Sequence, residues 1–352
     1  MMKRVCVWLM IGGLILWLPS GAGGSNCQVE PSDPGSEVGL VRHLSVDCTE
    51  REREARAVDA TQLLQAFREG KGIDLVGVVI RGDLSLDMLA VDRLPPELEG
   101  MKELQGLEVR MIHGSMKIVN SVVRGTIKYG SRQGLLVVQG PVSFNGSRFE
   151  QVVDLSRSVF LQPVTLSGAQ FLRESYFVQG RFLRGLYAEN TMFGPHTRFH
   201  RSIFQGPVTF RQSRFNGLAE FLEVTFEKDA DLSHSYFTLG TGFSGSRFQG
   251  RADFSDVTFE REAFFTFTLF DGDAYFPGAR FQSTADFSDA SFKGRDDFSK
   301  AHFNQKPQFT GAAKPATVQA AQEGENQVVH YAVGFTLLAF IALLGVYLIR
   351  SR

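Results

Sequence analysis

Large apolar residues recur from residue 144 onward at separations that alternate between five and six residues. The series runs without a break from Phe144 to Phe309 and comprises 31 positions, of which 27 are Phe, three are Leu and one is Ala188. The full span of 165 residues equals 15 units of 11. Ala188 is the only small residue in the series, so we expect Tyr187 to turn inward there with its hydroxyl finding a partner.

A second series of small residues stands two positions before each large one. In extended chain, residues two apart point to the same side, so each segment buries one large and one small side chain. Asp, Arg, Gln, Glu and Gly dominate the positions between them, which suit water and corners. The small residues of the five-residue intervals begin with Ser147, Ser158, Ala169, Gly180, Thr191 and Ser202, and those of the six-residue intervals include Ala219, Ala230, Ala252, Ala263, Ala274 and Ala285.

The alternation of intervals predicts how many segments make one coil of a solenoid. Successive coils of a solenoid stack in register, so a coil must hold an even number of alternating intervals. A coil of two segments is too short to surround opposed Phe rings. A coil of three segments would place a five-residue interval over a six-residue interval of the next coil. Four segments give 22 residues per coil with a roughly square section. The regular stretch then makes about seven coils, a rod about 35 Å long at roughly 4.8 Å per coil.

Near-identical segments support this periodicity and carry a family resemblance. ADFSDVTF at 252–259 and ADFSDASF at 285–292 are 33 residues apart, which is one and a half coils, and ADLSH at 230–234 is a shorter copy. This unit resembles that of the pentapeptide-repeat superfamily, in which the central residue is Leu or Phe and the residue two before it is small. The resemblance is to the Phe-rich branch with eleven-residue double units, and it covers at least residues 144–309.

The resemblance implies an all-β fold, a right-handed quadrilateral β-helix, and such proteins often carry a membrane segment. The best-known relatives shield bacterial topoisomerases by imitating DNA, and they are acidic and cytoplasmic. This chain has 37 basic and 38 acidic residues and a net charge of −1. We therefore do not transfer that function, and near-neutral charge also argues against nucleic-acid binding.

Upstream of the regular repeat the pattern is less uniform. Residues 23–58 are interpreted as a linker or N-terminal segment, with Pro, Gly and Ser enriched in 28–44. Residues 59–72 predict a capping helix with Asp59 as its N-cap, Gln62 at the third helical position, Gly70 after its last turn and an apolar face of Leu63, Leu64 and Phe67. Residues 73–143 predict irregular aliphatic coils, interrupted by a loop at 91–106 that contains a double proline.

Both ends of the chain predict membrane targeting. Residues 1–22 have a basic start, the apolar run Val5–Leu18 and small residues before a cleavage site, which is the layout of a signal peptide. A regular repeat at 144–310 and a linker at 311–327 precede a transmembrane helix at 328–349, whose uncharged core is Tyr331–Ile349. Arg350 and Arg352 in the tail 350–352 predict a cytoplasmic C-terminus. We therefore predict a single-pass protein of the bacterial inner membrane with a periplasmic repeat domain.

Three cysteines are present, and Cys6 lies within the predicted signal peptide. Two cysteines, Cys27 and Cys48, remain in the exported chain and predict a disulfide that ties down the N-terminus. Lipidation of Cys27 and a pair of free thiols are the alternatives. No Cys/His spacing typical of zinc occurs.

Few residues suggest chemistry. His196 and His200 are four apart and expected on successive sides of a coil, facing outward, with a metal site as the alternative to solvated surface. Asp271 and Asp273 resemble the start of a calcium loop but lack the further oxygens it needs. Asp296 takes an inward position that Ala fills elsewhere, and burying an acid costs free energy. We therefore expect the solenoid to be irregular near this end, where Pro307 also takes an inward position.

Charged residues also recur in outward columns. They are interpreted either as a binding site for a polyanion or a charged partner, or as a solvated face with weak ion pairs. The acidic members are Asp231, Asp253, Asp286 and Asp297, and the basic members are Arg148, Arg198, Arg214, Arg247 and Arg280.

The sequence therefore predicts no catalytic, cofactor-binding or metal-binding residues and no cofactor. We interpret the protein as a membrane-anchored extracytoplasmic scaffold that contacts a protein or glycan without catalysis. A relative of pentapeptide-repeat channel-type membrane proteins is the alternative, and a polysaccharide-lyase-like enzyme lacks the necessary cluster of acids and bases. The expected partners are the membrane, through the single C-terminal helix, and an unidentified protein or glycan, but no nucleic acid; a homodimer remains open.

Overall fold

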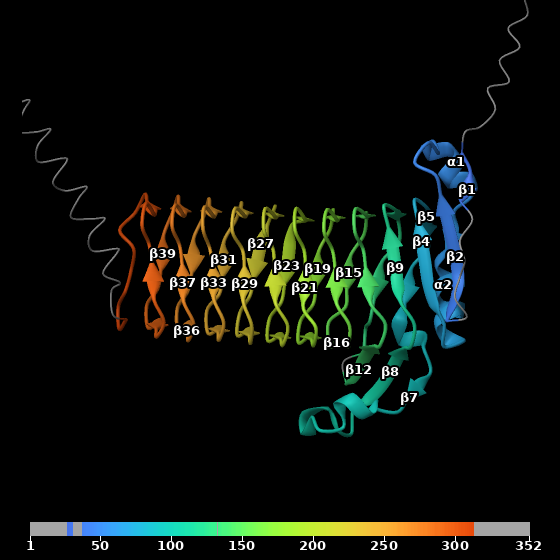
Figure 1. The fold of residues 1–352 in the computed structure, drawn as a ribbon, viewed down its shortest axis with the longest axis horizontal. Helices are drawn as coiled ribbons and strands as arrows, with labels where there is room; N and C mark the ends of the chain where they lie inside the picture. The colour runs from blue at the N-terminus through green and yellow to red at the C-terminus, as the bar shows by residue number, and fades with distance from the viewer. Residues whose placement is uncertain (1–26, 31–36, 132, 313–352) are drawn as a thin grey trace, which may run out of the picture.

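The chain folds into an elongated rod of stacked coils (Figure 1). The structure is a computed structural model that describes residues 27–30, 37–131 and 133–312. Each regular coil contributes one short strand to each of four parallel sheets, A to D, in that order along the chain. Val142 pairs with Val164, Val164 with Leu186 and Leu186 with Val208, so successive coils are displaced by 22 residues. This confirms the predicted coil length and four-sided section.

The four sheets contain 12, 11, 9 and 10 strands. Sheet A contains β1 Val29–Glu30, β2 Val38–Leu44, β4 Gly72–Val76, β9 Met116–Val119, β13 Val142–Ser143, β17 Val164–Thr165, β21 Leu186–Tyr187, β25 Val208–Thr209, β29 Ala230–Asp231, β33 Ala252–Asp253, β37 Ala274–Tyr275 and β41 Asp296–Asp297. Sheet B contains β3 Val58–Asp59, β5 Val79–Arg81, β10 Val122–Val123, β14 Arg148–Phe149, β18 Gln170–Phe171, β22 Met192–Phe193, β26 Arg214–Phe215, β30 Tyr236–Phe237, β34 Thr258–Phe259, β38 Arg280–Phe281 and β42 His302–Phe303.

The other two sheets complete the square. Sheet C contains β6 Leu84–Ser85, β11 Ile127–Lys128, β15 Val153–Asp154, β19 Ser175–Tyr176, β23 His196–Arg198, β27 Leu218–Glu220, β31 Thr241–Gly242, β35 Ala263–Phe264 and β39 Ala285–Asp286. Sheet D contains β7 Val91–Asp92, β8 Glu108–Ile112, β12 Gly134–Val138, β16 Ser158–Phe160, β20 Arg181–Phe182, β24 Ile203–Phe204, β28 Thr225–Phe226, β32 Arg247–Phe248, β36 Leu269–Phe270 and β40 Ser291–Phe292.

The core is a bundle of stacked phenylalanine rings along the axis of the rod. The large residues of the repeat are inward and almost all fully buried. In sheet B, Phe149 stacks on Phe171 with ring centroids 4.9 Å apart, and Phe215 stacks on Phe237 at 4.6 Å. This spacing equals the separation of neighbouring strands, so the ladder of backbone hydrogen bonds and the stack of rings support each other.

The two kinds of interval make two kinds of corner. In each five-residue interval the residue two places after the large one has a positive φ, at the A–B corner (for example Gly146) and the C–D corner (for example Arg157). The N–H of Ser147 bonds the carbonyl of Phe144 at 3.1 Å, which closes a tight turn of the kind that needs positive φ at its third position. Many of these turn residues are not Gly, and the sequence pattern alone did not reveal this conformation.

Buried hydroxyl groups connect successive coils at the same corners. Ser202 Oγ donates to the carbonyl of Phe177 at 2.6 Å and accepts from the N–H of Gly180 at 3.0 Å. Ser213 Oγ makes the same pair of bonds to Ala188 and Thr191. The small position therefore carries Ser or Thr where a polar backbone group would otherwise be buried without a full set of partners.

The N-terminal end of the rod is covered by helices and an extra pair of strands. Helix α1, Glu50–Ala55, begins at a capping box between Thr49 and Glu52. Helix α2, Ala60–Arg68, begins at Asp59, whose carboxylate accepts from the N–H of Thr61, and Gln62 completes its capping box. The predicted helix is thus present, and its buried face includes Leu63, Leu64 and Phe67.

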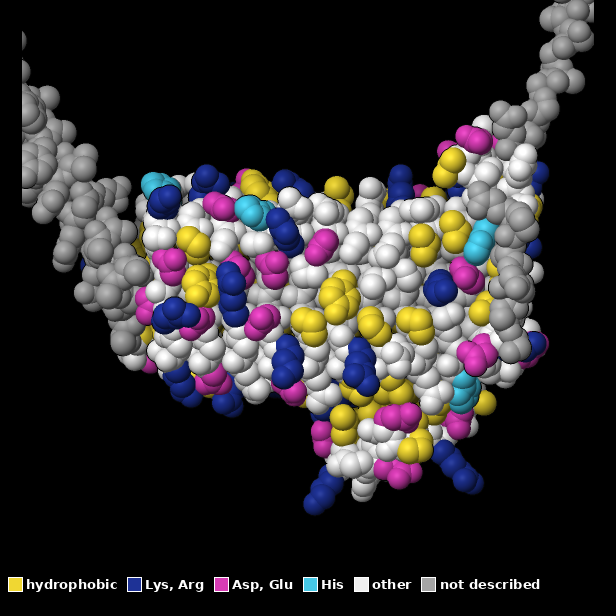
Figure 2. Space-filling model, viewed as in Figure 1, with side chains coloured by type: hydrophobic (Ala, Val, Ile, Leu, Met, Phe, Trp, Pro, Cys, Tyr) yellow, Lys and Arg dark blue, Asp and Glu magenta, His cyan; other side chains and the backbone are white. Residues whose placement is uncertain are grey.

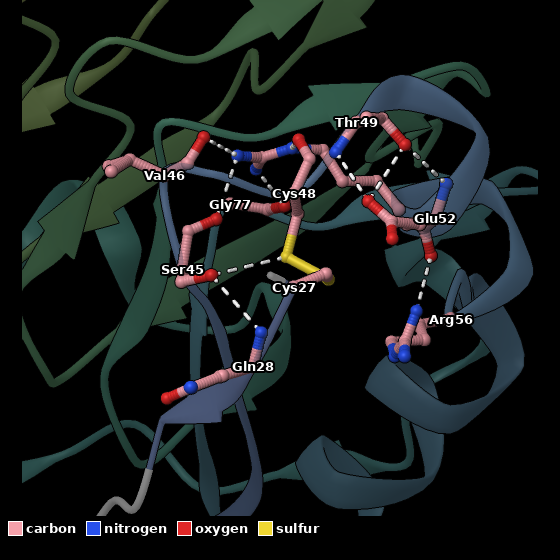
Figure 3. Close-up of a disulfide and its surroundings, with 10 residues drawn as sticks. Cys27, Gln28, Ser45, Val46, Cys48, Thr49, Glu52, Arg56 and Gly77 are labelled. Atoms are coloured by element: carbon pink, nitrogen blue, oxygen red, sulfur yellow. Dashed lines mark hydrogen bonds between the residues drawn. A yellow bond between two sulfur atoms is a disulfide. The ribbon is translucent and has the colours of Figure 1, made fainter. Parts of the chain in front are cut away.

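A disulfide joins Cys27 to Cys48, as the sequence predicted (Figure 3). Ser45 lies beside it, with Oγ 3.4 Å from Cys48 Sγ and accepting from the N–H of Gln28 at 3.2 Å. The guanidinium of Arg53 donates to the carbonyls of Cys48 at 2.9 Å and Ser45 at 3.1 Å. Because the sulfur of Cys27 is bonded to Cys48, the alternatives of free thiols and lipidation do not fit this arrangement.

Residues 23–58 differ from the predicted linker. Within them β2 pairs in parallel with β4 and forms part of sheet A, while β1 pairs antiparallel with β2. The Pro, Gly and Ser content of this segment concealed the strand Val38–Leu44, which is apolar at alternate positions only in part.

The predicted signal peptide at 1–22 and transmembrane helix at 328–349 lie outside the described residues, as do the tail 350–352 and nearly all of the linker 311–327. None of the helices within 27–30, 37–131 and 133–312 is long and apolar enough to cross a membrane.

Candidate binding surface

One segment makes the largest break in the register of the described coils, since Leu84 pairs with Ile127, 43 residues further along the chain. Residues 86–107 stand between β6 of sheet C and β8 of sheet D and are called the insertion below. They form three 3₁₀ turns, η1 Leu86–Met88, η2 Pro96–Leu98 and η3 Lys102–Leu104, together with β7. Figure 1 shows the insertion projecting sideways from the rod near β8 and β12. The predicted loop at 91–106 is therefore an ordered projection.

The insertion packs on the outer face of sheet D. Val109 and Met111 of β8 and Val137 of β12 are buried there, although the core lies on the opposite face. Leu98 and Leu104 of the insertion complete this separate apolar cluster. In Figure 2 apolar side chains lie where the insertion meets the rod. The strands of the first coils are apolar on both faces because the insertion covers the outer one.

A groove runs beside the insertion along the D–A corner. It consists of two adjoining hollows of about 460 and 530 Å³ that share Leu183, Arg184 and Gln205. The first hollow continues to Gly206, Pro207, Lys228 and Asp229, and the second to Glu97, Gln139, Leu161 and Gln162. The groove therefore extends across several coils and has one wall formed by the insertion through Glu97.

At the floor of the groove the backbones of two neighbouring coils lie close together. A Cβ on Gly206 would lie 2.3 Å from the carbonyl carbon of Arg184, so this position must stay free of a side chain. Leu161, Leu183 and Pro207 provide apolar surface, while Gln139, Gln162 and Gln205 provide amides. Two cations, Arg184 and Lys228, and two acids, Glu97 and Asp229, balance in formal charge. The lining is suited to recognition by shape and hydrogen bonds, and it contains no Ser, His or Cys nucleophile or base.

Comparison with known protein families finds a similarity within the regular coils. Residues 197–235 match the family model described as pentapeptide repeats (9 copies). Over these residues the chain is similar to pentapeptide-repeat proteins. The matched stretch lies in the middle of the regular coils, and the same register continues on both sides of it. No curated protein and no solved structure shows a significant match to the chain.

His196 and His200, the pair singled out from the sequence, do not converge on a common site. His196 lies in β23 and His200 in the turn that follows, so both flank sheet C rather than lying on successive sides. His196 Nε2 is 2.8 Å from Glu220 Oε2, whereas His200 Nε2 is 3.8 Å from Glu223. Burial raises the pKa of Glu220, but hydrogen bonds from His196 and Arg198 together outweigh it and the pKa is lowered overall. Within the described chain no three His, Cys, Asp or Glu side chains gather as a metal site.

Asp271 and Asp273 belong to ion-pair ladders between coils. Asp271 contacts Lys293 at 2.8 Å and Arg247 at 2.5 Å, and hydrogen bonds from these two groups lower its pKa. Asp273 accepts from the backbone N–H of Arg295 at 2.9 Å and pairs with its guanidinium at 3.0 Å, which lowers its pKa. Both carboxylates are therefore already engaged by cations of neighbouring coils.

Asp296 lies in β41 opposite Ala274, which is the inward position predicted from the sequence. It is half-buried rather than enclosed, and Pro307 is buried. Phe292 and Phe303 are also only partly buried, so the core becomes more open in the last coil. This opening reduces the cost of an acid in that position.

Some members of the outward charged columns form local contacts, while Asp231, Asp286 and Asp297 accept from a backbone N–H two residues further on. Arg148 lies 3.5 Å from Glu150, and the Arg214 guanidinium stacks over Tyr236 at 4.2 Å from the ring centroid. Such exposed pairs contribute little and leave a solvated face. The sequence reasoning did not anticipate the groove, because only the folded chain brings the insertion beside the D–A corner. The available signal was the apolar character of both faces in 134–138, together with Val109 and Met111 on the outer face of 108–112.

Proposed function

We propose that this pentapeptide-repeat protein is a membrane-anchored extracytoplasmic scaffold that binds a partner through the groove beside the insertion, without catalysis. The observation that carries this proposal is the insertion itself, which projects from the rod, buries an apolar cluster against the outer face of sheet D and borders a groove through Glu97. A regular solenoid needs no such element for stability, since each coil is stabilised by its neighbours.

The stacked rings of the rod support the scaffold role. Rings packed along the axis at 4.5–5.5 Å leave few ways for coils to move independently, so the groove is presented on a rigid support. A rigid, preformed surface loses little freedom when a partner binds. We favour a protein partner, because the groove combines apolar surface, amides and charges of both signs; a glycan is the alternative.

The extracytoplasmic location rests on the signal-peptide and transmembrane patterns of the sequence and is supported by the disulfide Cys27–Cys48. Disulfides persist mainly in oxidising compartments. Protease added to spheroplasts should digest the repeat domain and spare a reporter fused after Arg352. A protected repeat domain would contradict this location.

Site-specific cross-linking tests the groove. A photo-reactive amino acid at Gln205 of the groove, introduced into the full-length chain in cells, should give one discrete cross-linked product. The same amino acid at Thr209, on the outer face of sheet A, is the matched control and should give none. The mass of the product distinguishes a protein from a glycan.

A second variant checks that the cross-link reports binding. Leu183→Arg should abolish the product at Gln205 while leaving the melting temperature close to that of the parent, because Leu183 is only partly buried. Equal labelling from Thr209, or labelling that survives Leu183→Arg, would contradict the groove as the binding surface.

A further inference from the structure

The insertion borders a second hollow on its other flank, next to the C–D corner. This hollow has a volume of about 240 Å³ and is rich in arginine. It is lined by Glu103, Leu104, Leu107, Leu135, Arg157, Gln179, Arg181, Arg201 and Ile203. Three guanidinium groups thus face one small space together with a single carboxylate.

The repeat itself sets the positions of these arginines. Arg157, Gln179 and Arg201 are the positive-φ residues of three successive C–D corners, each with φ 56°. Because strands of a sheet lie roughly 4.8 Å apart, Arg157 and Arg201 are held about 10 Å from each other with Gln179 between them. Arg181 of β20 belongs to the middle coil. The arginines therefore surround the hollow from fixed points on a rigid lattice.

The charges of this cluster are only partly neutralised. Arg181 Nη2 is 2.7 Å from Glu103 Oε1 of the insertion, and Arg201 Nε is 2.9 Å from Glu223 Oε2. Arg157 Nε donates to the carbonyl of Gly134 at 3.1 Å, and the described part of the chain offers it no acidic partner. The three arginines thus have two acidic partners, of which only Glu103 lines the hollow, and His200 lies 3.8 Å from Glu223.

The existing contacts leave donors for a ligand. A guanidinium has five N–H donors, so each arginine keeps some that its present partner does not use. The pair Arg201–Glu223 is about half exposed on both sides, and exposed pairs of this kind exchange partners at little cost. Leu104, Leu107 and Ile203 form an apolar wall that strengthens charge–charge attraction by excluding water from one side.

We propose that this hollow is a binding site for an anionic oxygen group, a phosphate or a carboxylate, carried by a larger ligand. Arginine forks match both groups in geometry. The hollow, of about 240 Å³, has room for one such group. The inference goes beyond the proposed function, because the hollow lies on the opposite flank of the insertion from the groove and requires no protein partner.

Titration calorimetry on the purified full-length chain tests this site with tripolyphosphate and citrate as probes. At low ionic strength we expect binding of at least one probe, weakened by added salt. Arg157→Gln should weaken that binding at least about tenfold, since a charge-assisted hydrogen bond is lost. Binding of tripolyphosphate alone identifies a phosphate ligand, and binding of citrate alone identifies a carboxylate ligand.

Two further variants keep the test decisive. Arg201→Gln should also weaken binding of the probe. Because the side chain of Arg201 is exposed, this variant should keep its stability and can replace Arg157→Gln if the latter lowers the melting temperature. Arg211→Gln removes an exposed arginine outside the hollow and should leave the affinity unchanged. Absence of binding by both probes at millimolar concentration, or an equal loss in Arg211→Gln, would overturn the proposal.

Discussion

Ala188 occupies an inward position that holds Phe or Leu in all the remaining segments of the regular repeat. The sequence suggested that Tyr187 would turn in to fill the space, and this is wrong. Tyr187 pairs in register with Thr165 and Thr209 on the outer side of sheet A, while Leu186 is fully buried in the position that is usually small. A large and a small residue have exchanged places within one segment, and the total buried volume is kept.

This exchange makes a specific prediction for the core. Ala188→Leu should lower the free energy of unfolding by about 1–3 kcal/mol, because Leu186 already fills the space and added methyl groups overpack it. Combining it with Leu186→Ala restores the usual order of small and large residues, so the double variant should recover most of the loss. Urea denaturation of the three variants measures this. Stabilisation by Ala188→Leu alone would show that the site is empty.

Inward and outward residues of one coil should differ strongly in their effect on stability. Phe243 is fully buried and stacks on Phe221 and Phe265, so Phe243→Ala should cost about 3–5 kcal/mol. Arg247 is half exposed and pairs with Asp271, so Arg247→Ala should cost less than about 1 kcal/mol. Similar melting temperatures for both variants would contradict the assignment of faces.

At the scale of the element, the repeating unit is a strand of two or three residues followed by a corner. Single strands this short have no stability of their own, and the coil forms because each strand bonds to neighbours on both sides. Helix α2 and the pair β1–β2 cover the first coil, where such neighbours end. The buried Ser and Thr hydroxyls add a second set of bonds between coils.

These hydroxyls can be tested with a matched pair of serines. Ser202→Ala should lower the free energy of unfolding by about 1–3 kcal/mol, because it removes bonds to Phe177 and Gly180. Ser158 is equally buried, but its hydroxyl has no hydrogen-bond partner among the described residues. Ser158→Ala should therefore be close to neutral or stabilising. Equal losses in denaturant titrations of the two would show that the hydroxyl bonds contribute nothing.

At the scale of the whole molecule, ion pairs between coils make stability depend on pH. Hydrogen bonds from Lys293 and Arg247 lower the pKa of Asp271, and a hydrogen bond from Arg81 lowers that of Glu54. A carboxyl whose pKa is lower in the folded state than in the unfolded state stabilises the fold above its ordinary pKa of about 4. This contribution is lost as the pH falls through the folded-state pKa.

The urea midpoint should therefore be lower at pH 3 than at pH 7. Asp271→Asn removes one such carboxylate and should reduce the difference between the two pH values. Arg211→Gln, which alters none of these contacts, serves as the control and should keep the parent's difference. A midpoint that does not change with pH, or an unchanged difference in Asp271→Asn, would contradict the role of these pairs.

The sequence by itself determined the periodic part of the molecule. The alternating intervals from Phe144 to Phe309 predict stacked coils of 22 residues, because only an even number of intervals repeats in register and two segments are too short to surround opposed rings. The helix at Asp59 and the pairing of Cys27 with Cys48 were predictable for a similar reason, since capping and disulfide bonding depend on a few residues of particular type.

Only the tertiary structure decided the features that break the period. Residues 38–44 become a strand because β4 offers an edge beside them, and the insertion becomes ordered because Val109, Met111 and Val137 present an apolar outer face. The arginine hollow and the part of the groove beside Glu97 depend on the same contact, since they lie where the insertion borders coils up to about a hundred residues away in sequence. A repeat specifies its own neighbours through local pattern, whereas the position of an insertion depends on the surface that it buries against the rod.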